Sequence, residues 1–433
     1  MGIEIRLTRR IGVRRLWYTY RMRVAALFVA ALALVSCAKK EGGLSAGPEF
    51  QKQLQEALIT AKPGAVIEIP EGKHALDRQI SLSVANVTLR GKGMAKSILS
   101  FATQKSGSSG LSVTAGGFTI EDLAIEDAKG DGLKINGADG VTIRRVRAEW
   151  TGGPKETNGA YGLYPVQCKN VLIEDSVVIG AADAGFYVGQ SDNIIVRRNR
   201  AEANVAGIEI ENSTHADVYE NTATKNTGGI LVFNLPGLPV QGGSYTRVYN
   251  NQVIDNNLAN FAPKGNMVAS VPAGTAVMVL ATHHVEVFKN TIKDNGSYGV
   301  SVMSFGTTGH PVKDTKYHPY TSSIYVHDNA ISGNGAKPDG RVKRDLEARL
   351  GTPIPALIFD GVQDPKAAKP LPDEARVCFQ NNGDVTFANY DAGNGFKKIS
   401  KDVKAHDCAL PALSAVTLPP APATVSSTAG GGR

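Results

Sequence analysis

The segment IIVRRNRAEANVAGIEIENSTHADVYENTATKNTGG, residues 194–229, repeats a pattern of side chains after 22 residues. Each copy ends a short apolar run on valine, places an asparagine three residues later, and starts the next apolar run with glycine. The matching residues are Val196, Asn199 and Gly207 in the first copy, and Val218, Asn221 and Gly229 in the second. Repetition at a period of about 20–50 residues indicates stacked structural units. The segment therefore predicts a solenoid.

Asparagine forms two parallel columns along the second half of the chain. The first column is Asn199, Asn221, Asn251, Asn290, Asn329 and Asn381. The second lies five residues later each time and consists of Asn204, Asn226, Asn256, Asn295 and Asn334. Asparagine tolerates a left-handed backbone, and its amide can bond to an equal amide above and below. We expect these residues to join the turns of successive coils and not to act as ligands.

The apolar runs align into a series of coils. Their first-strand landmarks are Leu89, Ile120, Ile143, Ile173, Val196, Val218, Val248, Val287, Val326 and Cys378. The second strands start at Gly132, Gly162, Gly185, Gly207, Gly229, Gly274, Gly299 and Ala356. The shortest intervals are 22 and 23 residues, so the longer ones carry insertions. We predict about ten coils.

This layout resembles the right-handed parallel β-helix of the pectin-lyase-like superfamily. The stretch LQEALITAKPGAVIEIPEGKHAL, residues 54–76, is similar to the entry coil of that superfamily. The resemblance covers residues 50–390 and implies an all-β parallel β-helix solenoid with an N-terminal capping helix. It also implies repeats like those of polysaccharide lyases, epimerases and copper-maturation proteins. One scaffold hosts many chemistries, so the resemblance leaves the activity open.

The catalytic signatures of the known enzyme families are missing from the sequence. It contains neither the Asp-Pro-His-Asp motif of alginate epimerases nor the Trp-Ile-Asp-His element of pectate lyases. The Asn-Thr-Asp, Asp-Asp and Gly-His-Gly signatures of polygalacturonases are also absent. No catalytic set can therefore be carried over residue by residue.

The N-terminal residues have the character of a bacterial lipoprotein signal. Basic residues precede an apolar run at 24–35, which ends in Leu-Val-Ser before Cys37. We interpret 1–36 as a signal peptide starting at Met1 or Met22, with Cys37 as the lipidated residue. Residues 37–48 form a tether, residues 49–408 the β-helix domain with its cap helix, and residues 409–433 a disordered tail rich in Pro, Ser, Thr and Gly.

Charge and cysteine content place the mature chain in a cell envelope. Residues 1–36 contain seven arginines and one acid, so the chain from Cys37 onward is close to neutral, which argues against nucleic-acid binding. We expect a monomer anchored to the membrane through Cys37. An outer-membrane lipoprotein facing the periplasm or the surface fits best. Cys378 and Cys408 could form a disulfide there, whereas Cys168 reads as a buried hydrophobe.

Insertions fall at two corners of the coil. Corner one, between first and second strand runs, carries residues 149–159, 256–273 and 334–355, and corner two, before the next coil, carries 233–245, 303–323 and 359–376. Loops on one face of a solenoid commonly form its binding surface. Five of the eight histidines lie at corner two.

Corner two supplies the candidate site residues. His215, Tyr245 and His284 each lie three residues before a landmark, so we expect them to stack along one edge. The substrate-binding candidates are His215, Tyr245, His283, His310, Lys313, His318 and Tyr320. The catalytic candidates are His284, Lys316 and Tyr317. A polar, solvated loop with scattered histidines is the alternative.

Two functions are consistent with these residues. In the first, aromatic side chains stack on sugar rings and a lysine neutralises a uronate, so the protein binds an acidic polysaccharide. If it is an enzyme, a base would act in a lyase or C5-epimerase reaction. In the second, the protein is a non-catalytic scaffold or handles a metal, as copper-maturation proteins do. Ca²⁺ and a transition metal both stay open as cofactors, since turn acids such as Asp131 and Asp183 could bind Ca²⁺.

Overall fold

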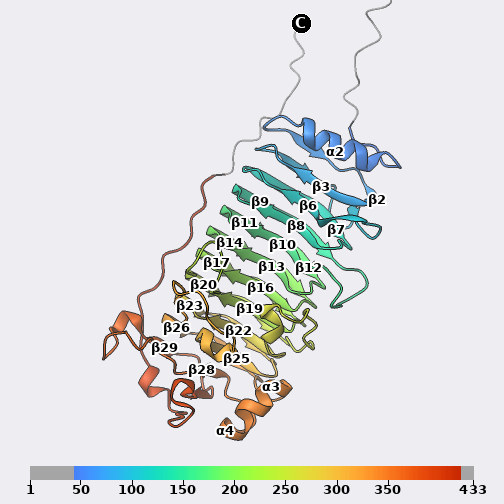
Figure 1. Cartoon of the computed structure of the whole chain (residues 1–433). Helices are drawn as coiled ribbons and strands as arrows, with labels where there is room; N and C mark the ends of the chain where they lie inside the picture. Colours follow the sequence, from blue (N-terminus) through green and yellow to red (C-terminus); the bar gives the residue numbers. More distant parts are fainter. Residues whose placement is uncertain (1–42, 421–433) are drawn as a thin grey trace, which may run out of the picture. The chain divides into compact units, whose positions relative to one another are not determined.

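A computed structural model describes residues 43–420 of the chain. In this part the backbone winds through successive coils, and each coil contributes short strands to three faces (Figure 1). Every strand pair within the faces is parallel, and equivalent strands of neighbouring coils are hydrogen-bonded. No helix within residues 43–420 is long and apolar enough to cross a membrane.

The strands are assigned to the faces as follows. The first face contains β1 (Val66–Glu68), β4 (Thr88–Arg90), β11 (Lys169–Glu174), β14 (Asp192–Arg197), β17 (Thr214–Tyr219), β20 (Ser244–Tyr249), β23 (His283–Phe288), β26 (Ser322–His327) and β29 (Val377–Gln380). The second face contains β2 (Gly72–Ala75), β5 (Ser97–Ser100), β12 (Val177–Ile179), β15 (Arg200–Glu202), β18 (Thr222–Thr224), β21 (Gln252–Ile254), β24 (Thr291–Lys293) and β27 (Ala330–Ser332). The long strands β7 (Phe118–Glu126) and β9 (Asp139–Glu149) run through both faces.

The third face is a sheet of eleven strands within the described residues. It contains β3 (Arg78–Leu82), β6 (Ser106–Val113), β8 (Asp131–Asn136), β10 (Tyr161–Val166), β13 (Ala184–Gly189), β16 (Ala206–Glu211), β19 (Gly228–Phe233), β22 (Thr275–Leu280), β25 (Tyr298–Met303), β28 (Leu357–Phe359) and β30 (Phe387–Asn389). Within residues 43–420, three α-helices lie outside the faces: α2 (Phe50–Thr60), α3 (Gly340–Val342) and α4 (Ala348–Leu350).

The predicted strand register is confirmed for all but the last coil. Leu89 pairs with Ile120, and the series continues through each landmark to Val326. These side chains are buried in the core. Val326, however, pairs with Phe379 and not with Cys378, which pairs with Tyr325. On the third face, Gly229 lies opposite Ala276 and not Gly274, because the insertion before β22 shifts the alignment by two residues.

The two asparagine columns are buried hydrogen-bonded ladders. The Nδ2 atom of Asn251 donates to Oδ1 of Asn290 at 2.9 Å and to the carbonyl of Val218 at 2.9 Å. Its own Oδ1 accepts from the backbone N–H and from Nδ2 of Asn221, both at 3.0 Å. The second column repeats this arrangement from Asn204 to Asn334. The prediction that asparagines join the turns is confirmed.

The end of the first ladder differs from the prediction. Asn382 and not Asn381 accepts from the Asn329 backbone N–H at 3.2 Å and donates to the Val326 carbonyl. Asn381 instead occupies the left-handed position one residue earlier, with φ 53°. The predicted asparagine is one residue too early, as is the predicted landmark Cys378 relative to Phe379. Both errors have the same cause, because the long insertion before β29 removes the sequence spacing on which the alignment depends.

A glycine is required where neighbouring coils approach closely. A Cβ atom built on Gly229 would lie 2.4 Å from Cγ1 of Val253 and 2.6 Å from the Ala276 carbonyl oxygen. No side chain fits at these distances. This packing explains the regular glycine at the start of the third-face strands.

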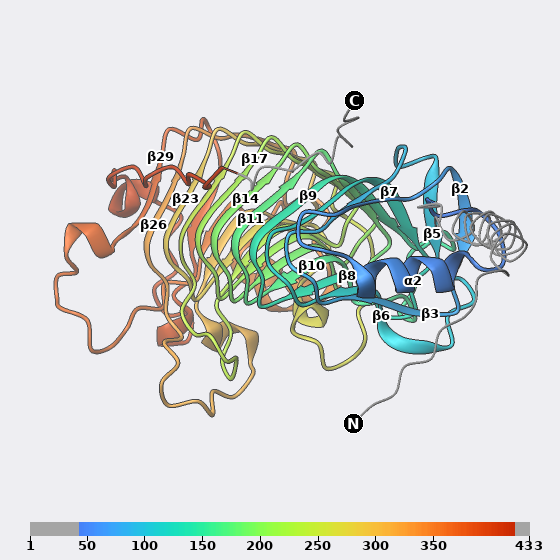
Figure 2. The same cartoon turned by 90° about the horizontal axis from the view of Figure 1, so that it is seen from above.

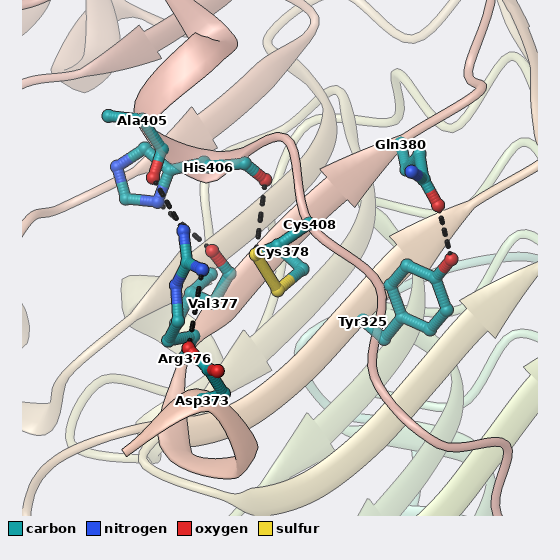
Figure 3. The surroundings of a disulfide bond; sticks show 9 residues. All are labelled: Tyr325, Asp373, Arg376, Val377, Cys378, Gln380, Ala405, His406 and Cys408. Atoms are coloured by element: carbon teal, nitrogen blue, oxygen red, sulfur yellow. Dashed lines mark hydrogen bonds and ion pairs between the residues drawn. A yellow bond between two sulfur atoms is a disulfide. The ribbon is translucent and has the colours of Figure 1, made fainter. Parts of the chain in front are cut away.

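Both ends of the stack carry additional contacts. At the first coil, α2 buries Phe50, Leu54 and Leu58 against the adjoining strands (Figure 1). At the last coil, Cys378 and Cys408 form the expected disulfide (Figure 3). Cys168 is a free, buried cysteine, as its sequence context predicts.

The segment after the disulfide differs from the expectation of disorder. Residues 409–420 run in extended form along the first face, from β29 towards the earlier coils (Figures 1 and 2). The Leu413 N–H donates to Glu286 and the Val416 N–H donates to Asp217. These tertiary hydrogen bonds hold a segment whose composition alone favours disorder. The predicted signal peptide, the lipidation site Cys37 and residues 421–433 lie outside the described residues.

Corners one and two both border the third face, because each of its strands begins at corner one and ends at corner two. The six insertions therefore flank one sheet and leave the first face free of long insertions along one of its edges. The first face offers regular columns of outward side chains, whereas the third face is enclosed by loops.

The ladder predicts a large and local stability effect. We expect Asn251→Ala to lower the free energy of unfolding by about 2–4 kcal/mol, because it leaves several buried groups of the neighbouring coils without a partner. Asn136→Ala is the control, since Asn136 is exposed and its side chain makes no hydrogen bond within residues 43–420. Chemical denaturation of both variants measures the difference. Equal stabilities would contradict a structural role of the ladder.

Candidate functional site

Each first-face strand from β4 to β26 carries a residue with left-handed backbone near its start. In the earlier coils this residue is Asn86, Gly117, Gly140, Asn170 or Asn193, and in the later coils it is His215, Tyr245, His284 or Ser323. Asn and Gly suit this conformation, whereas Tyr adopts it rarely. The ring of Tyr245 stacks on His215 with centroids 5.2 Å apart and on His284 at 4.6 Å. The predicted stack of these three residues therefore forms.

A second ring column lies four residues further along the same strands. Tyr219, Tyr249, Phe288 and His327 stack in order, with centroids separated by 4.8, 4.9 and 5.2 Å. In both columns the faces of inner rings lie against neighbouring rings. Ring edges and the end faces of the columns are left for a ligand, except at His327, whose ring also stacks on Tyr325 with centroids 3.9 Å apart. Stacking of a sugar on each ring, as the sequence suggested, does not suit this geometry.

Between the two ring columns lies a charged row formed by Asp217, Arg247 and Glu286, one from each of three successive coils. An Nη1 atom of Arg247 lies 3.2 Å from Oδ2 of Asp217. The guanidinium also lies 4.8 Å from the ring centroid of Tyr249, which adds a cation–π contact. We call this row with its two flanking ring columns the outer groove.

The charged row is buried but incompletely hydrogen-bonded. The side chains of Asp217 and Arg247 are 4% and 14% exposed. Neither Oδ1 of Asp217 nor Nε of Arg247 has a partner within residues 43–420. Burial raises the pKa of Asp217, while Arg247 and the Val416 N–H act in the opposite direction. A buried donor and acceptor without partners are costly, so a ligand that supplies both partners would be stabilised.

His327 connects the charged row to the second ring column. Its Nε2 lies 3.1 Å from Oε1 of Glu286, and its Nδ1 lies 2.8 Å from Oδ2 of Asp328. Burial lowers the pKa of His327, but the two carboxylates outweigh burial, so its pKa is raised overall. This pairing leaves the second oxygen of Glu286, Oε2, to accept the Leu413 N–H at 3.0 Å.

The C-terminal segment lies in the outer groove without filling it. Leu413 and Val416 contact Glu286 and Asp217 through their backbone N–H groups, and the Thr417 carbonyl accepts from Asn193 at 3.2 Å. A cavity of about 380 Å³ remains between residues 410–414 and the first ring column. The groove thus accommodates an extended chain through hydrogen bonds to its charged row.

The family comparison agrees with this coil geometry. Residues 96–235 match the family model described as a right-handed β-helix region. The chain is a right-handed parallel β-helix. None of the curated proteins matches its sequence significantly.

Several solved structures are similar to this β-helix over part of its length. The mannuronan C-5 epimerase AlgE4 A-module of Azotobacter vinelandii has 20% identity and a TM-score of 0.43, over 68% of this chain and 87% of that one. The catalytic unit of a GH87 α-1,3-glucanase from Streptomyces thermodiastaticus has 19% identity and a TM-score of 0.48, over 69% and 59%. An alginate lyase from Paenibacillus has 17% identity and a TM-score of 0.41, over 64% and 92%.

The remaining predicted site residues separate into two groups. His283, His318 and Tyr320 lie near one another, with the His283 and His318 rings 4.8 Å apart and the His318 and Tyr320 rings 5.4 Å apart. His318 also contacts Asp364 at 3.2 Å. This group lies beside the start of β23, next to His284 in the groove.

The loop at 303–323 places its other candidates elsewhere. Tyr317 is buried, packs against Phe305 and donates its hydroxyl hydrogen to the Asn234 carbonyl at 2.5 Å. Burial raises its pKa far above the ordinary value, which does not suit a catalytic base. His310, Lys313 and Lys316 are exposed, and their side chains form no hydrogen bond or ion pair within residues 43–420. No described contact joins them to the groove.

Sequence reasoning missed the charged row and the second ring column. Both could have been predicted from the strand register. Alternate residues of a strand point to one face, so the residue before each landmark and the residue after it point outward with His215, Tyr245 and His284. These positions are Asp217, Arg247 and Glu286 before the landmarks, and Tyr219, Tyr249, Phe288 and His327 after them.

The third face contains a further polar cluster that the sequence did not single out. Glu209 and Glu211 of β16 are buried on the outer side of the third face. Tyr187 donates to Oε1 of Glu211 at 2.6 Å. Burial raises the pKa of both glutamates. Asp183 lies beside them, contacts Asn266 at 2.9 Å, and has its pKa raised to about 7 by burial and by the charge of Glu211. Asp183 thus belongs to this cluster and is not an ordinary turn residue.

The described residues do not assemble a metal site. Within 43–420, no group of three or more His, Cys, Asp or Glu side chains is placed to hold a metal ion. Trp150, at corner one, is buried and donates to the Ala128 carbonyl at 2.7 Å, which gives it a packing role.

The burial of His283 predicts that the protein loses stability in acid. Burial, with the nearby His318 and His284, lowers its pKa to about 4. An unfolded chain binds the proton near pH 6.5, so the unfolded state gains protons first as the pH falls from about 6.5 to about 4. The resulting loss is at most about 3 kcal/mol. We expect His283→Gln to lose less stability than the wild type between pH 7 and pH 4.5.

Thermal unfolding at both pH values measures this effect. His310→Gln is the matched control, because its ring is exposed and forms no hydrogen bond, ion pair or ring stacking within residues 43–420. An identical pH dependence in wild type and His283→Gln would contradict the assignment.

Proposed function

We propose that the outer groove binds an extended glycan chain. The observation that carries the proposal is the unpartnered Oδ1 of Asp217 and Nε of Arg247, buried side by side between two ring columns. A sugar hydroxyl donates one hydrogen bond and accepts others. One hydroxyl can therefore donate to Asp217 and accept from Arg247 at once. A backbone amide of the C-terminal segment supplies only a donor at this point.

The repeat of the coils suits a chain ligand. Three successive coils each present one ring from each column and one charged residue between them, so similar contacts recur over this part of the stack. The exposed edges of the rings carry polar atoms, as in Tyr245 and His284, which can hydrogen-bond to hydroxyls. We therefore expect recognition through hydrogen bonds at ring edges, with face stacking restricted to the ends of the columns.

The charge of the groove favours a hydroxyl-rich neutral glycan. Asp217 and Glu286 oppose a polyanion, and Arg247 is already paired with Asp217. The lysines expected to neutralise a uronate lie in the loop at 303–323, outside the row. We expect neutral oligosaccharides to bind more tightly than oligoalginate or oligogalacturonate, and this comparison tests the expectation of an acidic substrate.

Lyase or epimerase chemistry would need a base beside the bound chain, and His284 is the candidate in the groove. Burial lowers its pKa, so its ring is neutral near pH 7 and can accept a proton. Both reactions need a uronate, so unsaturated products from a uronate chain would assign lyase chemistry, and inversion at C5 without unsaturated products would assign epimerase chemistry. Binding without product would limit the function to recognition.

The ligand and the C-terminal segment compete for the same groups. Glu286 and Asp217 accept from Leu413 and Val416, so a glycan that uses them must displace residues 409–420. The segment crosses the groove over a cavity and makes few hydrogen bonds, which makes displacement feasible. The segment is then a lid on the glycan site.

Titration of an oligosaccharide panel into three proteins tests the proposal. Removal of residues 409–433 should raise the affinity for the bound glycan by at least about fivefold, because the competing segment is gone. Arg247→Gln should lower it by about tenfold through loss of hydrogen bonds to a charged group. Calorimetric titration measures both values.

Arg200→Gln is the matched control. Arg200 is an exposed arginine of the second face that pairs with Glu202, remote from the charged row in the coil. Its affinity should equal that of the wild type. If the shortened protein binds no glycan of the panel, or if Arg200→Gln and Arg247→Gln lose affinity equally, the groove is not a glycan site.

A further inference from the structure

The outer side of the third face changes character along the stack. In successive coils one row reads Lys134, Tyr164, Tyr187, Glu209, Leu231 and Met278. The neighbouring row continues through Glu211, Phe233, Leu280 and Met303. The later coils therefore present apolar side chains outward, where a solvated sheet would carry polar ones.

Insertions from both corners border this apolar area without covering it. Residues 267–272 and 341–346 approach from corner one, and residues 304–309 from corner two. Together with the segment at 390–396 they surround a cavity of about 570 Å³. Its apolar lining comprises Phe233, Met278, Leu280, Met303, Tyr390 and Phe396. The cavity is concave, mostly apolar and partly open to solvent, and a cavity of this size with a few polar groups is typical of small-molecule binding sites.

Two polar side chains line the cavity, the buried Tyr298 and the exposed Arg341. Tyr298 is 4% exposed, and its hydroxyl has no hydrogen-bond partner within residues 43–420. Burial raises its pKa far above the ordinary value, so the hydroxyl keeps its proton and can donate. Arg341 lines the same cavity, donates one hydrogen bond to the Ser270 carbonyl at 2.5 Å, and forms no ion pair with any described residue. Its other N–H groups are free to bind an anion.

We propose that this cavity is a second binding site, for a small carboxylic acid with an apolar chain. The chain lies against the methionine and aromatic lining, and the carboxylate accepts from Arg341 and from the Tyr298 hydroxyl. Arginine binds carboxylates with charge-assisted hydrogen bonds, which fixes the head group. Burial of the chain supplies the remaining affinity. Asp345 also lines the rim, and its charge restricts the carboxylate to the side of Arg341.

This site is independent of the outer groove in residues and in ligand. No residue lining the cavity belongs to the charged row or to the two ring columns. A glycan does not suit the cavity, because its hydroxyls would lose water against methionine and phenylalanine side chains. An uncharged apolar molecule would satisfy the lining but leave Arg341 and Tyr298 unused.

Titration of sodium hexanoate, octanoate and decanoate into the full chain tests the proposal. We expect saturable binding of one molecule per chain, with affinity rising about fourfold per added methylene. Arg341→Gln should weaken decanoate binding by about tenfold or more and leave decanol binding unchanged. Tyr298→Phe, which removes only the hydroxyl, should weaken decanoate binding several-fold.

The control variant is Arg344→Gln. Arg344 is exposed on the same insertion, does not line the cavity, and should bind decanoate like the wild type. Thermal unfolding of each variant checks that the fold is intact. Absence of saturable binding to the wild type overturns the proposal. It is also overturned if Arg341→Gln and Arg344→Gln have equal effects, or if Arg341→Gln weakens decanol as much as decanoate.

Discussion

Hydrogen bonds from one asparagine side-chain amide to the next fix the register of the stack from Asn199 onward. Each amide in the ladder joins its own coil to the coils before and after it. A slip of one residue in a coil would separate these amides and turn its apolar side chains outward. The ladders therefore force equivalent residues of the coils that they join into straight columns. The groove exists because this constraint places His215, Tyr245 and His284 directly above one another.

The same scaffold presents two faces with different chemistry. The first face is open and regular, and its charged row lies under a segment of the chain's own C-terminus. The third face receives all six long insertions, which convert an apolar sheet surface into a cavity and bury Glu209 and Glu211. Regular columns suit a repeating ligand, whereas an enclosed cavity suits a small one. The positions of the insertions, and not the coils themselves, separate these two uses.

The register could be predicted from the sequence because it depends on a repeat that is local and almost constant. The predicted register is wrong at β29, where a long insertion interrupts the spacing and Phe379 takes the pairing position predicted for Cys378. The ring stack followed from equal offsets before each landmark. That the ring faces are occupied by other rings could be recognised only from the distances between ring centroids in the structure. Arg247 was not predicted as a site residue because the candidates were chosen around the histidines, although strand alternation places it in the same groove.

The lid could not be predicted from composition. Residues 409–420 are rich in alanine, proline and leucine and lack a strand pattern. Their position depends on carboxylates that lie more than a hundred residues earlier in the chain, at Asp217 and Glu286. Such contacts leave no local signal. The cluster of Glu209, Glu211 and Asp183 was missed for a similar reason, since its burial is produced by an insertion from a later coil.

Hydrogen exchange of the C-terminal segment tests the central claim, that the outer groove holds a displaceable lid over a ligand site. The amides of Leu413 and Val416 report directly on the two hydrogen bonds to the charged row. Saturation with a bound oligosaccharide should make these two amides exchange faster, while the amides of β17, β20 and β23 stay protected. If the oligosaccharide binds and both segment amides keep their protection, the ligand does not use the groove and the account is wrong.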